Sequence, residues 1–115
     1  MTTELLSIIK SATGFDAKPL VNDVIEDCIL YKEQTIADDG VKARHRLELR
    51  IITSSYSNSE LYASQLIEAL VNIGDEMEID GIYESNMNGG GVLFDDGTQT
   101  IHRIIYFEFI TRSSK

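Results

Sequence analysis

The 115-residue chain has one cysteine, Cys28, and two histidines. A single thiol cannot form an internal disulfide, and these side chains are too few to supply the four ligands of a structural zinc site. Long apolar runs are also missing, since none approaches the roughly 20 residues that span a bilayer. The N-terminus lacks the basic start and apolar stretch of a signal peptide, so we expect a soluble protein made in a cytosol, with no membrane contact.

Positive charge is scarce. Lys and Arg number 10 against 19 Asp and Glu, which gives a formal net charge of −9. Nucleic-acid readers and proteins that dock on anionic lipid need clustered basic residues, so the charge argues against both classes. Because 43% of the residues are apolar and 25% are charged, the composition is that of an ordinary globular protein. We expect a single domain over residues 1–115.

Two stretches have the apolar spacing of amphipathic helices. Residues 1–13 repeat apolar side chains at i, i+3, i+4 and i+7 ahead of Gly14, and this pattern predicts an N-terminal helix. Residues 57–73 carry a wider apolar stripe and predict the main helix. Ser57 and Glu60 at its start have the spacing of a capping box.

Two segments predict β-hairpins. In the first, 28–53, Arg46, Glu48 and Arg50 alternate with leucine and isoleucine after an Asp38-Asp39-Gly40 turn in which Gly40 can adopt positive φ. In the second, 92–112, the turn is Asp95-Asp96-Gly97. Residues 86–91, Asn-Met-Asn-Gly-Gly-Gly, precede it and predict a flexible loop.

The last strand of the second hairpin carries apolar residues on both of its faces. One face carries Ile105, Phe107 and Phe109, and the other carries Ile104, Tyr106 and Ile110. Such a strand is expected to be buried on both sides. The predicted fold is α+β, an antiparallel-rich sheet of four to five strands with two main helices packed on one face. A neighbouring subunit could then cover the second face.

No local sequence motif gives strong support to a catalytic, phosphate-binding or metal-binding role. Cys28, His45 and His102 could form a nucleophile pair, but a packed thiol and two surface imidazoles explain them better. Gly89-Gly90-Gly91 lacks the Gly-Lys-Ser/Thr of a phosphate loop. The paired aspartates fit turns better than a calcium loop. We therefore expect no enzyme, no cofactor and no metal site.

The order of elements is informative beyond composition. It runs from a helix through Val24–Glu33 (VIEDCILYKE) and a polar hairpin, then Arg46–Leu70 (RLELRIITSSYSNSELYASQLIEAL), to a final strand at Arg103–Ile110 (RIIYFEFI). This order, over roughly residues 3–112 and most densely over Leu47–Leu70, resembles the tail terminator proteins of long-tailed bacteriophages. These tail-completion, or tail-to-head joining, proteins are often labelled minor capsid proteins.

The resemblance implies a structural virion protein, assembled in the host bacterial cytoplasm and located at the head–tail junction. It implies a homo-oligomeric, hexameric ring that meets a tail-tube protein and a head-completion protein, while DNA passes through without specific binding. A ring needs two different contact surfaces on each subunit. A net charge of −9 would keep DNA from adhering if acidic residues line the lumen.

Two sets of residues are the candidates for these contacts. Six residues are expected at the subunit interface: Arg46, Glu48, Arg50, Ile104, Tyr106 and Ile110. In the alternative interpretation, the three charged residues lie on a solvated face and the three others lie in the core. Those expected in lumen or docking loops are Asp38, Asp39, Asn88, Gly89, Gly90, Asp95 and Asp96. Two other classes remain open: a small acidic inhibitor or immunity-type protein that binds a basic enzyme, and a small hydrolase that uses carboxylates.

Overall fold

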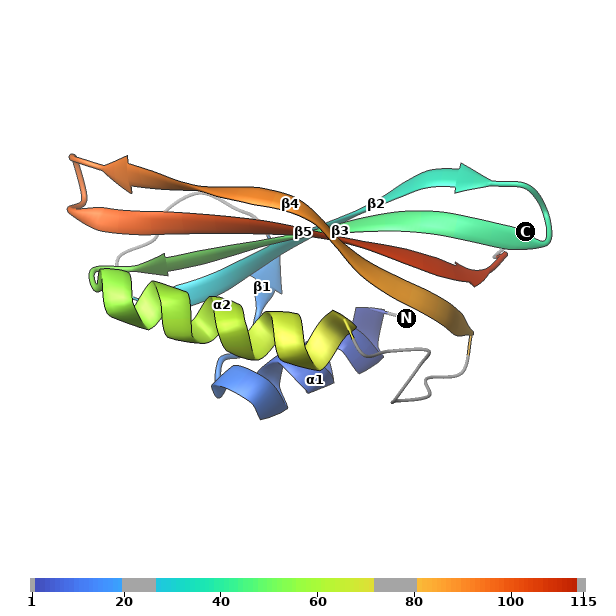
Figure 1. Ribbon diagram of the computed structural model, residues 1–115, viewed down its shortest axis with the longest axis horizontal. Helices are drawn as coiled ribbons and strands as arrows, with labels where there is room; N and C mark the ends of the chain where they lie inside the picture. The colour runs from blue at the N-terminus through green and yellow to red at the C-terminus, as the bar shows by residue number, and fades with distance from the viewer. Residues whose placement is uncertain (1, 20–26, 72–80, 114–115) are drawn as a thin grey trace.

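The computed structural model describes residues 2–19, 27–71 and 81–113. The described residues form two helices and one five-stranded sheet. The elements are α1 (Thr2–Thr13), β1 (Lys18–Pro19), β2 (Cys28–Asp38), β3 (Lys42–Thr53), α2 (Tyr56–Val71), β4 (Ile82–Asp95) and β5 (Thr100–Arg112). Both helices lie on the same side of the sheet (Figure 1).

The sheet has the strand order β1-β2-β3-β5-β4. Three of the pairings are antiparallel, and only the short pairing of β1 with β2 is parallel. This confirms the predicted α+β class and the antiparallel-rich sheet. Because β3 and β4 are both antiparallel to β5, they run in the same direction, and α2 crosses over β5 to connect them.

Local hydrogen bonds mark the end of α1 and the start of α2. After α1, Gly14 has φ +84°, and its N–H donates to the Lys10 carbonyl at 2.8 Å, a helix ending that favours glycine. Before α2, the Ser55 hydroxyl accepts the Asn58 N–H at 3.2 Å, so Ser55 is the N-cap. The predicted capping box at Ser57 is therefore wrong, because Ser57 already lies inside the helix. The predicted last residues of this helix, 72–73, lie outside the described residues.

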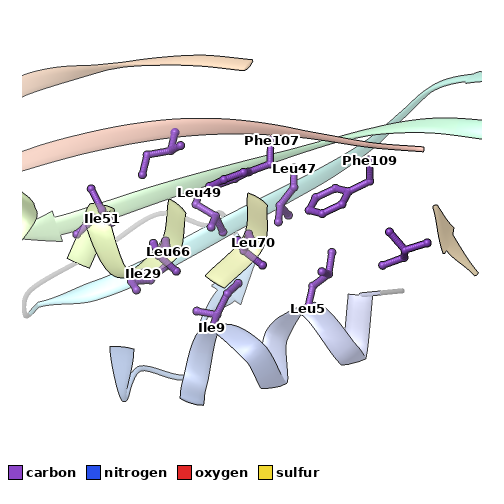
Figure 2. Close-up of a cluster of buried hydrophobic side chains, with 13 residues drawn as sticks. Leu5, Ile9, Ile29, Leu47, Leu49, Ile51, Leu66, Leu70, Phe107 and Phe109 are labelled. Atoms are coloured by element: carbon purple, nitrogen blue, oxygen red, sulfur yellow. The ribbon is translucent and has the colours of Figure 1, made fainter. Parts of the chain in front are cut away.

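The hydrophobic core lies between the helices and one face of the sheet (Figure 2). Polar contacts fix α2 at both ends: the Arg103 Nε–H of β5 donates to the Ser59 hydroxyl at 3.1 Å, and the Ser85 hydroxyl of β4 donates to the Leu70 carbonyl. The fully buried side chains of the core include Leu5, Ile9, Ile29, Leu47, Leu49, Ile51, Leu66, Leu70, Phe107 and Phe109.

Residues 86–91 are not a loop. They belong to β4 and pair with β5, with an irregular register between Met87 and Gly90. Gly90 allows close packing, because a Cβ there would collide with the Ile104 carbonyl oxygen. Gly89 has φ +97°, a backbone conformation that favours glycine. Asn88, Gly89 and Gly90 are therefore strand residues, and the flexible-loop prediction is wrong because cross-strand pairing with β5 outweighs weak local β-propensity.

The last strand is fully buried on one side only. Ile105, Phe107 and Phe109 are buried in the core. Ile104, Tyr106 and Ile110 are half-buried on the helix-free side. The expectation of burial on both sides is wrong for a single chain, because both helices pack on the same face.

Candidate functional site

The helix-free side of the sheet, called here the open face, collects residues from β2, β3 and β5. Its middle is defined by three rows that the strand register aligns: Lys32 and Gln34, then Arg44, Arg46, Glu48 and Arg50, then Ile104, Tyr106, Glu108 and Ile110. The six residues predicted for the subunit interface all lie on this face. Beside the predicted ones, the register adds four polar residues that the sequence reasoning missed: Lys32, Gln34, Arg44 and Glu108.

Charges on the open face are unevenly paired. Arg44 Nε lies 2.9 Å from a carboxylate oxygen of Glu108, and Arg50 Nη2 lies 3.8 Å from one of Glu48. The Arg46 guanidinium instead lies over the Tyr106 ring, 5.7 Å from its centroid. This cation–π contact orients Arg46 without neutralising it.

A shallow hollow of about 130 Å³ is open in the middle of this face. It is lined by Lys32, Gln34, Arg46, Glu48 and Tyr106, and we call it the basic depression. Among the residues the structure describes, neither Lys32 nor Arg46 has a carboxylate within 4.0 Å. The depression therefore presents two cations and an aromatic ring to solvent, together with the Glu48 carboxylate, which lies near Arg50. The excess of positive charge suits a carboxylate ligand.

The turn between β2 and β3 projects from one end of the sheet (Figure 1). Gly40 has φ +91°, as the turn pattern predicts. The N–H groups of Val41 and Lys42 donate to the Asp39 carboxylate at 2.8 and 2.7 Å, and the Gly40 N–H donates to Asp38 at 2.9 Å. These backbone bonds, that of Lys42 first, lower the pKa of Asp39. Both carboxylates therefore stabilise the turn that carries them.

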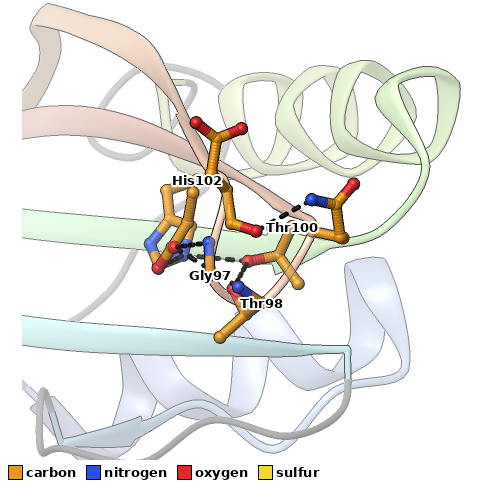
Figure 3. A network of polar contacts seen from close by, with 7 residues as sticks. Gly97, Thr98, Thr100 and His102 are labelled. Atoms are coloured by element: carbon orange, nitrogen blue, oxygen red, sulfur yellow. Dashed lines mark hydrogen bonds and ion pairs between the residues drawn. The ribbon is translucent and has the colours of Figure 1, made fainter.

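The turn between β4 and β5 projects from the opposite end (Figure 1). Here the Gly97 N–H donates to the Asp95 carboxylate at 2.9 Å, and hydroxyls link Thr98 to Thr100 and Thr100 to His102 (Figure 3). Burial, followed by the nearby charge of Arg50, lowers the pKa of His102, and Asp95 opposes this. These hydrogen bonds link the turn to the start of β5.

Large apolar side chains are exposed next to this second turn. Val92, Leu93 and Phe94 are 42%, 60% and 59% exposed, and they lie on β4, an edge strand of the sheet. The sequence pattern predicts that they lie in a strand but does not indicate their exposure. Leu93 is on the open face with His102, and Val92 and Phe94 are on the helix side with Arg103 and Ile101. A single sequence does not show which parts of either face are left uncovered.

The structure does not bring the candidate nucleophile pair together. The His45 ring lies 3.2 Å from both Thr35 and Glu33. Cys28 and His102 both flank Ile52, one on β2 and one on β5, which separates them by two strand spacings or roughly 10 Å. Within the described ranges there is no group of three or more His, Cys, Asp or Glu that could hold a metal ion. No described helix is long and apolar enough to cross a membrane.

Comparison with known proteins identifies similarity at the level of fold. No protein-family model matches the chain, and no curated protein matches it. Among solved structures, the chain is similar to a chain of the virion of a native gene transfer agent (GTA) particle. The TM-score is 0.65 at 15% sequence identity, and the match covers 95% of this chain and 84% of that chain.

Proposed function

We propose that the protein is a structural component of a phage-like virion, a subunit of the ring that terminates the tail tube and joins it to the head. The observation that carries this proposal is the similarity to a chain of a gene transfer agent virion over 95% of this chain. The order of elements supports the same class independently, since it resembles the tail terminators of long-tailed phages. Fold likeness alone does not assign a function, so the proposal also has to fit the surfaces.

The surfaces suit a subunit of a ring. Closed rings use heterologous contacts, in which each copy offers two different patches. The open face, with Arg46, Glu48, Arg50, Ile104, Tyr106 and Ile110, is one candidate patch, and it combines a charged row on β3 with half-buried apolar residues on β5. The two projecting turns, at Asp38–Asp39 and Asp95–Asp96, are the candidate contacts with the lumen, the tail tube or the head.

The charge distribution bears on the alternative function, a small acidic inhibitor that binds a basic enzyme. A small acidic inhibitor would present a mainly acidic face to a basic enzyme. The middle of the open face instead carries four basic residues, Lys32, Arg44, Arg46 and Arg50, and two acidic ones, Glu48 and Glu108. This favours the ring subunit over the inhibitor.

The test is size-exclusion chromatography with light scattering over a range of protein concentration, followed by negative-stain imaging. We expect a ring with a central hole, formed by the chain alone or on addition of isolated tail tubes. Isolated tubes capped at one end by the added chain would support the proposal. A monomer that binds neither tail tubes nor head-completion proteins would contradict it.

A further inference from the structure

The end of the β4–β5 hairpin has the features of a contact surface. Ten consecutive residues, 85–94, carry no charge, and the last three of them are the exposed Val92, Leu93 and Phe94. They lie on an edge strand, whose outer backbone groups have no strand partner within the described part of the sheet. Long apolar edge strands without charge are uncommon in proteins that remain monomeric.

An acidic residue adjoins this apolar stretch. Asp96 follows at the tip of the hairpin, and its carboxylate makes no hydrogen bond or ion pair with any described residue. Asp95 beside it is held by the turn. The hairpin end therefore offers apolar side chains next to an uncompensated negative charge.

The basic depression has the complementary features. Lys32 and Arg46 have no carboxylate of a described residue within 4.0 Å, although Glu48 also lines the depression. Tyr106 supplies an aromatic surface, and the half-buried Ile104 lies next to it on the same face of β5. The hairpin of the same chain cannot reach it: Thr100, which pairs with Asp95, lies six residues along β5 from Tyr106, a distance of roughly 20 Å.

We propose that the β4–β5 hairpin end of one copy, Val92–Asp96, docks on the basic depression of a second copy. Asp96 then lies beside Lys32 and Arg46, and Leu93 covers Tyr106 and Ile104. The charge complementarity of the two surfaces identifies the occupant as the chain itself, which carries the acidic half and the basic half at separate places. This contact rests on the proposed ring and names the surfaces that form it.

The contact is heterologous. A copy whose hairpin is docked still has a free depression, and the next copy fills it. Successive copies are then related by one repeated rotation, and the assembly closes when that rotation divides a full turn. The β2–β3 turn at the opposite end of the sheet takes no part in the contact and stays available to other virion proteins.

Charge reversal in the full-length chain tests the contact. Asp96→Lys and Arg46→Glu should each weaken self-association about tenfold or more, because each places like charges against one another. An equimolar mixture of the two variants, and the double variant, should regain most of the wild-type affinity, since both restore opposite charges across the contact. Sedimentation equilibrium measures the association, and circular dichroism checks that each variant is folded.

The matched control reverses an ion pair within one chain. Lys10 and Asp16 form an exposed salt bridge at 2.8 Å, away from both proposed surfaces. Lys10→Glu, Asp16→Lys and their double variant make the same changes of charge and should leave self-association unchanged. Lys32→Glu should weaken association like Arg46→Glu, which provides a second variant if Arg46→Glu does not fold.

Two results would overturn the inference. One is a wild type that self-associates while the test and control variants behave alike, which leaves the proposed ring intact but assigns it to other surfaces. The other is a wild type that stays monomeric at every concentration. In that case, binding to isolated tail tubes decides separately whether the proposed function also fails.

Discussion

At the scale of single residues, one hydroxyl determines where α2 begins. Ser55 accepts the Asn58 N–H, and its own N–H donates to Thr53 Oγ1 at 3.2 Å. The end of β3 and the start of α2 are thereby joined in one turn. Ser57, two residues later, has no capping role because it is already helical.

The two serines make a matched pair for a stability measurement. Ser55→Ala removes the acceptor of an orphan helix N–H and should lower the free energy of unfolding by about 1 kcal/mol. Ser57→Ala should change it by no more than about 0.5 kcal/mol, because Ser57 is exposed and alanine favours helix. Urea denaturation of both variants measures the difference. A larger loss from Ser57→Ala would show that the capping box forms after all.

At the scale of elements, β4 depends on a close approach to β5. A Cβ on Gly90 would meet the Ile104 carbonyl oxygen, whereas a Cβ on Gly91 would meet nothing within 4 Å. Neither glycine has positive φ, so any difference between alanine substitutions at the two positions reports on space alone.

Gly90→Ala should therefore lower the free energy of unfolding by about 1–3 kcal/mol, the usual cost of overpacking against a backbone that must shift. Gly91→Ala should be close to neutral, within about 0.5 kcal/mol. Thermal or urea unfolding gives both values, and amide exchange of residues 86–94 shows whether the loss is confined to the pairing of β4 with β5. Equal effects of the two substitutions would contradict the close packing at Gly90.

The sequence predicts the elements whose signals are local. The alternation of Arg46, Glu48 and Arg50 indicates a half-buried strand, Asp38–Gly40 indicates a tight turn, and the α+β class follows from the order of elements. The first half of β4 could not be predicted in the same way. Asn-Met-Asn-Gly-Gly-Gly has weak β-propensity, and its strand conformation comes from a partner that is distant in sequence.

At the scale of the whole molecule, the candidate site depends on register. The sequence indicates that Arg46, Glu48 and Arg50 share a face, but it does not show that Lys32 and Tyr106 lie beside them. That follows from the alignment of β2 and β5 on either side of β3, which pairs Glu48 with both residues. The exposure of Phe94, which lies on the helix side of β4, likewise depends on how far the helices extend over the sheet.

Salt concentration should act on self-association in two opposite ways. The net charge of −9 makes copies repel one another, and this repulsion extends over a molecule that measures 45 × 26 × 21 Å. The Debye length is about 10 Å at 0.1 M salt and about 3 Å at 1 M. The long-range repulsion is therefore screened first, and the short contact of Asp96 with Lys32 and Arg46 is weakened only at higher salt.

We accordingly expect self-association to strengthen up to about 0.1 M sodium chloride and to weaken between there and 1 M, because screening reaches contact distances only in the second range. Arg46→Glu should lose most of the decline at high salt, since the attraction of Asp96 to Lys32 is then offset by its repulsion from the new glutamate, while Lys10→Glu should keep it. Sedimentation equilibrium across a salt series measures both the rise and the decline of self-association. Association that rises steadily to 1 M in the wild type would mean that the contact is apolar throughout and that the charges of the basic depression do not contribute to it.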